Sequence, residues 1–140
     1  MILVIPILVC LIISIVLGWV WYGPFFGKKW MDITGANQND PARSAEMKKK
    51  MWVYILTQVV ISLVTLIAFS LFLAGFQSVT LFAAIIIATF LWLGFVLPTI
   101  AQHALWSGKS RKSSWAMFLI SGGYYLIAFV LYGVVFSFWL

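Results

Sequence analysis

Charged residues are scarce in this chain. Only 9% of its 140 residues are Asp, Glu, Lys or Arg, only three of these are acids, and 64% of all residues are hydrophobic. So little polar surface cannot cover a water-soluble globule, whereas charge-free apolar runs of about twenty residues are typical of transmembrane helices. The apolar residues do not alternate with polar ones, which excludes a β-barrel. We therefore predict an all-α integral membrane protein, with residues 1-140 forming a single domain.

Potential metal ligands and redox residues are nearly absent too. Cys10 is the only cysteine and lies deep in the first apolar run, so there is no disulfide framework and no CxxC pair. His103 is the only histidine, and a single histidine does not make a metal site by itself. We expect a buried structural role for Cys10, no metal and no cofactor.

Four apolar runs predict a bundle of four spans. They cover about residues 2-22, 51-74, 79-106 and 115-140. Pro98, late in the third run, removes a backbone hydrogen bond and is expected to kink that helix. None of the runs contains Asp, Glu, Lys or Arg, which argues against a coupled transporter because such carriers usually place an ionisable group near the midplane.

The long connection, residues 23-50, is expected to hold two helix starts. Pro24 is suited to begin a short interfacial helix, and Gly35 is suited to end it. Asp40 and Pro41 match an N-cap followed by proline at the first helical position, so the next helix should begin near Pro41. The apolar side chains of the short helix that we expect to face lipid are Phe25, Phe26, Trp30 and Ile33.

The distribution of positive charge predicts the orientation. All nine Lys and Arg residues lie in the segments 23-50 and 107-114. The positive-inside rule places both segments, including the interfacial helix, in the cytoplasm and both termini outside. The residues that we expect to meet the headgroups of anionic membrane lipids are Lys28, Lys29, Lys48, Lys49, Lys50, Lys109, Arg111 and Lys112. The alternative is that they serve only as a topology signal. Nucleic acid is not expected as a partner, because these residues lie too close to the membrane for a duplex to approach.

Polar side chains gather at one depth in the predicted bundle. At about 1.5 Å per residue, they lie roughly 5–16 Å inside the cytoplasmic boundary on all four spans, whereas the outer half has only scattered ones. Gln58 and Ser62 share a helix face by their i, i+4 spacing, as do Thr99 and His103. The predicted site residues are Trp21, Tyr22, Gln58, Ser62, Thr99, Gln102, His103, Tyr124 and Tyr125. This layer is either a set of interhelical hydrogen bonds that holds the bundle together, a pocket for a small or amphiphilic ligand, or a catalytic site.

Small residues at helical spacing predict close helix packing. The motifs are Ser14-xxx-Gly18, Ala84-xxx-Ala88 and Gly133-xxx-Ser137. They would serve either the bundle or a homo-oligomer.

The segment from Gly18 to Trp30 resembles a prokaryotic four-helix membrane family catalogued as domain of unknown function 1761. The matching residues are Gly18, Trp21-Tyr22, Pro24, Phe26-Gly27-Lys28 and Trp30, and the order of spans and loops extends the resemblance over nearly the whole chain. It implies a four-helix fold in a prokaryotic cell (inner) membrane, and it supplies no activity. Members often carry Gly-Tyr-His in the last helix, where this chain has Gly123-Tyr124-Tyr125.

Three functions remain open. The first is a binding or accessory protein whose cytoplasm-side polar layer holds a lipid-like ligand or a partner helix. The second is a small transporter or channel, alone or as a homo-oligomer, which would need polar residues through the outer half. The third is a membrane enzyme using His103, which would need further catalytic groups beside it.

Overall fold

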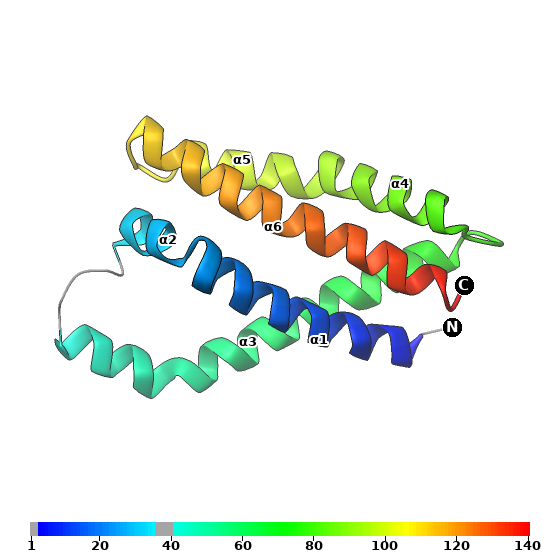
Figure 1. Ribbon diagram of the computed structural model, residues 1–140, viewed down its shortest axis with the longest axis horizontal. Helices are drawn as coiled ribbons and strands as arrows, with labels where there is room; N and C mark the ends of the chain where they lie inside the picture. Colours follow the sequence, from blue (N-terminus) through cyan, green and yellow to red (C-terminus); the bar gives the residue numbers. More distant parts are fainter. Residues whose placement is uncertain (1–2, 36–40) are drawn as a thin grey trace.

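The computed structural model describes residues 3–35 and 41–140, and within these ranges it contains helices and no strand (Figure 1). The elements in chain order are α1 (Val4–Val20), η1 (Trp21–Phe25), α2 (Gly27–Thr34), α3 (Pro41–Ala74), α4 (Leu81–Leu91), η2 (Trp92–Val96), α5 (Leu97–Leu105) and α6 (Arg111–Ser137). Four stretches are long and apolar enough to cross a membrane, namely Val4–Phe25, Pro41–Ala74, Leu81–Leu105 and Arg111–Ser137. The predicted all-α fold with four membrane-spanning helices is therefore confirmed.

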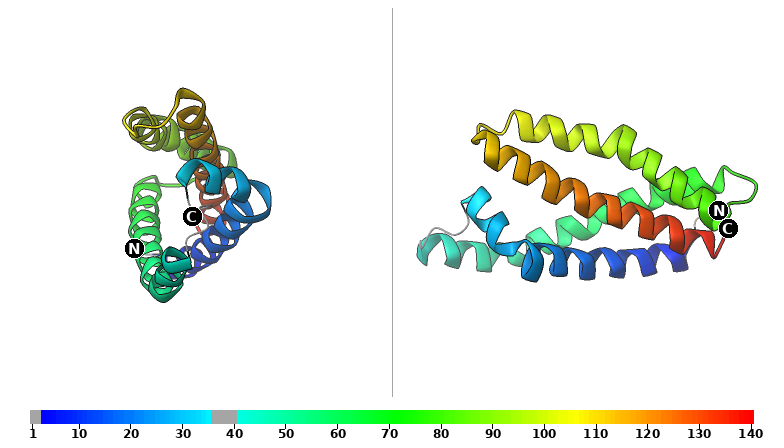
Figure 2. Two further views of the ribbon diagram at one scale, coloured as in Figure 1. Left: turned by 90° about the vertical axis from the view of Figure 1, so that its left-hand side faces the viewer. Right: turned by 45° about the horizontal axis from the view of Figure 1, so that its top comes forward.

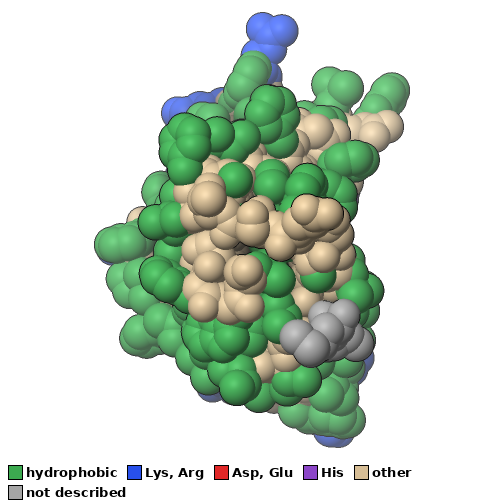
Figure 3. All heavy atoms as spheres, turned by 90° about the vertical axis from the view of Figure 1, so that its right-hand side faces the viewer, with side chains coloured by type: hydrophobic (Ala, Val, Ile, Leu, Met, Phe, Trp, Pro, Cys, Tyr) green, Lys and Arg blue, Asp and Glu red, His purple; other side chains and the backbone are tan. Residues whose placement is uncertain are grey.

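The two ends of the molecule differ in charge. The start of α1, the end of α6 and the α3–α4 connection lie at one end, and α2, the start of α3 and the α5–α6 connection lie at the other (Figures 1 and 2). Every Lys and Arg belongs to the second end, which we call the basic end. Figure 3 faces the opposite end, where hydrophobic side chains and backbone dominate and Lys and Arg appear only at the edges. The charge separation on which the predicted orientation rests is therefore present in the fold.

Helix α6 is the central element. It contacts α1, α2, α3, α4 and α5, and the small residues predicted to allow close packing serve these contacts. A Cβ atom on Gly133 would lie 2.8 Å from the Ala84 carbonyl oxygen of α4. Gly18 of α1 likewise lies against the Tyr124 hydroxyl of α6, where its Cβ would be 3.6 Å away.

An apolar core fills the half of the molecule away from the basic end. The Phe69 ring of α3 packs against Phe129, Tyr132 and Phe136 of α6, with ring centroids 5.6, 6.0 and 5.8 Å away. Cys10 is fully buried in the same core, as expected for a small structural residue. Aromatic side chains of α3 and α6 thus make up much of the core in that half.

Both prolines that were expected to shape helices lie at π-helical segments. Pro98 is the second residue of α5, two positions after η2 ends, and a π turn is one way in which a helix adapts to the missing N–H of proline. Pro24 lies inside η1, so it extends the first helix and does not begin the short one, contrary to the prediction. Gly35 ends α2 with φ of 73°, as predicted, and α3 begins at Pro41. The predicted N-cap, Asp40, lies outside the described residues.

The apolar face of α2 was predicted to meet lipid, and this is wrong for most of its residues. Ile33 is buried against Met117 and Ile120 of α6, and Phe26 and Trp30 pack against the same cluster. Only Phe25 remains strongly exposed. The turn at Phe26 folds α2 back over the N-terminal part of α6, so these side chains bury their apolar surface within the protein.

Candidate functional site

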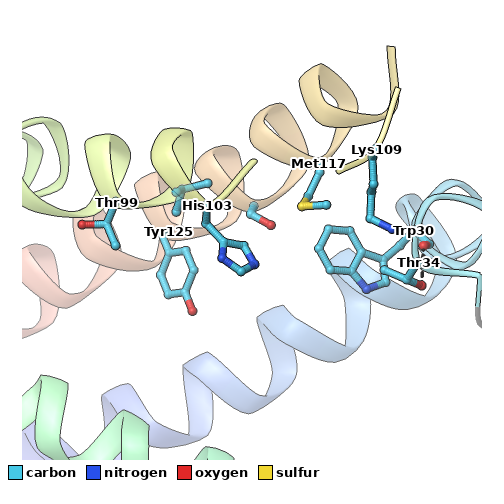
Figure 4. A pocket seen from close by; sticks show the side chains of 9 residues that line it. Trp30, Thr34, Thr99, His103, Lys109, Met117 and Tyr125 are labelled. Carbon is cyan, nitrogen blue, oxygen red and sulfur yellow. Dashed lines mark hydrogen bonds between the residues drawn. The ribbon is translucent and has the colours of Figure 1, made fainter. Parts of the chain in front are cut away.

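A hollow of about 490 Å³ lies between α2, α5 and α6 at the basic end. In Figure 4, His103 of α5 and Tyr125 of α6 reach into the same space, and Lys109 extends from the α5–α6 connection toward Trp30. The lining residues are Trp30, Thr34, Thr99, Ile100, His103, Lys109, Met117, Ser121 and Tyr125.

A second hollow of about 460 Å³ lies between α1, α3 and α6. Trp30 and Tyr125 line it as well, so the two spaces adjoin. Its other lining residues are Ser14, Ile15, Gly18, Trp19, Tyr22, Ile55, Gln58, Val59, Ser62 and Tyr124. Trp19 is 73% exposed and Ile55 is 58% exposed, so this space opens to the surface between α1 and α3. We call the two spaces together the polar hollow.

Most of the predicted site residues meet in the polar hollow. Those that line it are Tyr22, Gln58, Ser62, Thr99, His103, Tyr124 and Tyr125. The i, i+4 pairs predicted to share a helix face do so, since Gln58 and Ser62 line one side and Thr99 and His103 another. The common depth inferred from the sequence therefore corresponds to a common location.

Two of the predicted residues lie elsewhere. The Trp21 indole N–H donates to the Ile120 carbonyl at 2.9 Å, and its ring lies 3.1 Å from where a Cβ atom on Gly123 would be. Gln102 is exposed and lines neither part of the polar hollow. It precedes His103 by one residue, so its side chain lies at nearly the same depth but points about 100° away around α5.

Twelve of the lining residues were absent from the predicted site, among them Trp30, Thr34 and Lys109. Trp30 and Thr34 enter because α2 folds inward, and their i, i+4 spacing was the available signal. Lys109 was predicted to meet lipid headgroups, yet it also borders the polar hollow. No sequence pattern shows that the α5–α6 connection places this side chain over α2.

Hydrogen bonds between helical elements involve three predicted site residues, namely Trp21, Tyr22 and Tyr124, and several other residues as well. Ser14 and Tyr132 join α1 to α6, and the Tyr124 hydroxyl donates to the Ser14 carbonyl at 3.2 Å. Trp92 of η2 donates to the Gly122 carbonyl at 2.9 Å, and Trp21 of η1 donates to the Ile120 carbonyl of the same helix, α6, at 2.9 Å. The helices are thus joined mainly through α6, at or beside the polar hollow.

Several polar groups in the hollow are left without a bond to another helix. Gln58 donates to Ser62 within α3 at 3.3 Å, and Thr99 donates to the Phe95 carbonyl within the same helical stretch at 2.6 Å. His103 and Tyr125 have no hydrogen bond within the described part of the chain. These side chains are therefore available to a bound molecule.

The side chains that line the hollow offer few kinds of polar group. Its described lining offers hydroxyl, amide and imidazole groups with one lysine, and no acidic side chain. In the described residues no three His, Cys, Asp or Glu side chains lie close enough to hold a metal ion.

Four long apolar helices with a polar hollow at the basic end define a helical membrane protein. The chain belongs to the family described as "Protein of unknown function (DUF1761)", whose model matches residues 5–137. The resemblance seen at Gly18 to Trp30 is thereby confirmed over nearly the whole chain. No curated protein and no solved structure matches the chain.

Proposed function

We propose that this protein binds a lipid-like amphiphile in the polar hollow. The polar part of the ligand lies among Gln58, His103 and Tyr125, and its apolar part leaves the hollow between α1 and α3. The observation that carries the proposal is that the two spaces adjoin at Trp30 and Tyr125, which line both of them.

The size and the lining of the hollow support this proposal. Its two parts of about 490 and 460 Å³ fall in the range of small-molecule sites. Trp19 and Ile55 supply large exposed apolar surfaces at the opening, and the polar residues Ser14 and Tyr124 lie buried in the same lining. An amphiphile matches this combination.

The other functions receive less support. A transporter or channel needs a polar path across the membrane, and the apolar core around Phe69, Phe129 and Phe136 fills the half away from the hollow. An enzyme using His103 needs a further base or nucleophile within hydrogen-bond reach, and the described residues give His103 no hydrogen-bonding partner.

Thermal unfolding in detergent, with and without added lipid extract, tests the proposal. A ligand stabilises only the state that binds it. We expect Gln58→Ala, His103→Ala and Tyr125→Phe to unfold near the wild-type temperature without lipid and to lose most of the stabilisation that lipid gives.

Thr89→Ala and Ser137→Ala are the matched controls. Their hydroxyl groups donate within their own helices, to the Ile85 carbonyl at 2.8 Å and the Val134 carbonyl at 2.7 Å, so their removal should leave the lipid effect unchanged. Equal lipid stabilisation in both groups of variants would contradict a ligand site in the hollow. Destabilisation of the first group without lipid would instead favour a purely structural layer.

A further inference from the structure

A third hollow of about 570 Å³ lies on another face of the basic end, between α5 and α6. Its lining residues are Ala101, Ala104, Leu105, Lys109, Arg111, Ser114, Trp115 and Phe118. We propose that it binds one anionic phospholipid of the membrane, with the phosphate at Lys109 and Arg111 and an acyl chain along Leu105, Trp115 and Phe118.

The charge of this hollow suits a phosphate group. Lys109 and Arg111 both line it, and its described lining contains no acidic side chain. A guanidinium group presents paired N–H donors that match phosphate oxygens, and an ammonium group adds a compact positive charge beside it. A zwitterionic headgroup would bring its own cation against the same two side chains.

The connection that carries these cations is held in one conformation. Ser107 donates to the Ala104 carbonyl at 2.8 Å and lies 3.3 Å from the Ser114 hydroxyl, which ties the end of α5 to the first turns of α6. Gly108 adopts φ of 73°, where a side chain would be strained. Ser110 caps α6 by accepting from the Ser113 N–H at 3.3 Å. Lys109 and Arg111 therefore start from a fixed backbone, which lowers the entropic cost of binding.

Apolar surface beside the cations indicates a lipid and not a free anion. Leu105 is 73% exposed and Trp115 is 59% exposed in this hollow. Tryptophan and basic side chains at a helix end are typical of the membrane interface, where phosphate groups and acyl chains meet. Inorganic phosphate would leave this apolar surface uncovered.

This site is separate from the polar hollow. Lys109 borders both, whereas Arg111 and Trp115 line only the hollow between α5 and α6. Substitution of Arg111 therefore tests this inference and leaves the proposed function untouched.

The test is native mass spectrometry of the full chain in neutral detergent, titrated with phosphatidylglycerol or with phosphatidylcholine of the same acyl chains. The wild type should bind phosphatidylglycerol about tenfold more tightly than phosphatidylcholine, as expected for a charge-assisted contact. Arg111→Gln should bring the two lipids within about twofold. Arg111→Lys should keep part of the preference that Arg111→Gln loses, because lysine retains the positive charge but lacks the paired N–H donors of the guanidinium group.

Lys112→Gln is the matched control. Lys112 follows Arg111 directly, is exposed, and does not line the hollow, so its loss removes the same charge and should keep the wild-type preference. An equal loss of preference in Lys112→Gln and Arg111→Gln would overturn the site in favour of diffuse surface charge. Equal binding of both lipids by the wild type, or displacement of phosphatidylglycerol by excess inorganic phosphate, would also overturn it.

Discussion

The hydroxyl groups of Ser14 and Tyr132 lie 2.5 Å apart and join α1 to α6 where the polar hollow meets the apolar core. Ser14 gives its single hydroxyl proton to the Cys10 carbonyl at 2.8 Å, so Tyr132 is the donor in this pair. The Ser14 carbonyl accepts from Tyr124 as well. Ser14 of α1 thus accepts a hydrogen bond from each of two buried tyrosine hydroxyl groups of α6.

The contact between Ser14 and Tyr132 predicts that Ser14→Ala clearly lowers the free energy of unfolding. The substitution leaves the hydroxyl of Tyr132, which is only 5% exposed, without its acceptor, at a cost of about 1–3 kcal/mol in the free energy of unfolding. Tyr132→Phe leaves Ser14 bonded to Cys10 and should cost only about 0.6 kcal/mol, a usual value for a hydrogen bond between membrane helices. Unfolding in detergent measures both. Stability of Ser14→Ala equal to that of Ser137→Ala would show that the pair contributes nothing.

The close approach of α4 and α6 predicts that Gly133→Ala destabilises the protein. The added Cβ atom would lie 2.8 Å from the Ala84 carbonyl oxygen and 3.2 Å from the Ala88 Cβ, and overpacking of this kind costs about 1–3 kcal/mol. Gly94→Ala is the control, because nothing lies within 4 Å of its added Cβ. Alanine is the better helix former, so Gly94→Ala should be neutral or stabilising. The same melting temperature for both variants would contradict the packing described here.

Much of the fold follows from the sequence because hydropathy and helix-end chemistry are local. The apolar runs, the αL glycine at Gly35 and the helix start at Pro41 were all predicted from short segments. The role of Pro24 was not, because the residues around it continue the first helix as a π turn. The inward face of α2 depends on where the N-terminal part of α6 lies, which no local pattern specifies.

The sequence predicted how deep in the bundle the site residues lie better than it predicted which way their side chains point. Counting residues along a helix gives the level of a side chain, and seven of the nine predicted residues do meet at that level. The rotation of α5 that admits His103 and turns Gln102 outward depends on the packing of α5 against α6. Trp21 lies at the predicted depth, but its indole N–H donates to a backbone carbonyl of α6 and its side chain does not line the hollow.

The charge asymmetry predicts that the basic end faces the cytoplasm. In a Cys10→Ala background, Ser44→Cys and Ser110→Cys should be shielded from an impermeant thiol reagent in intact cells, and Ser78→Cys should react. All three serines are exposed in the structure, so shielding would reflect the membrane and not burial. Labelling of Ser44→Cys from outside would reverse the orientation and place the polar hollow on the outer side.

Occupancy of the polar hollow is tested most directly by filling it. Ser62 lines the hollow, and Val60, two residues earlier on α3, is exposed and does not. Because the two side chains point about 200° apart around the helix, Ser62→Trp places an indole in the hollow and Val60→Trp places the same indole outside it. The measurement is the amount of lipid-like material that co-purifies in detergent, identified by mass spectrometry. We predict that the wild type and Val60→Trp retain the same bound species and that Ser62→Trp loses it. Equal retention by all three proteins, or no bound species in the wild type, would contradict the proposed ligand site.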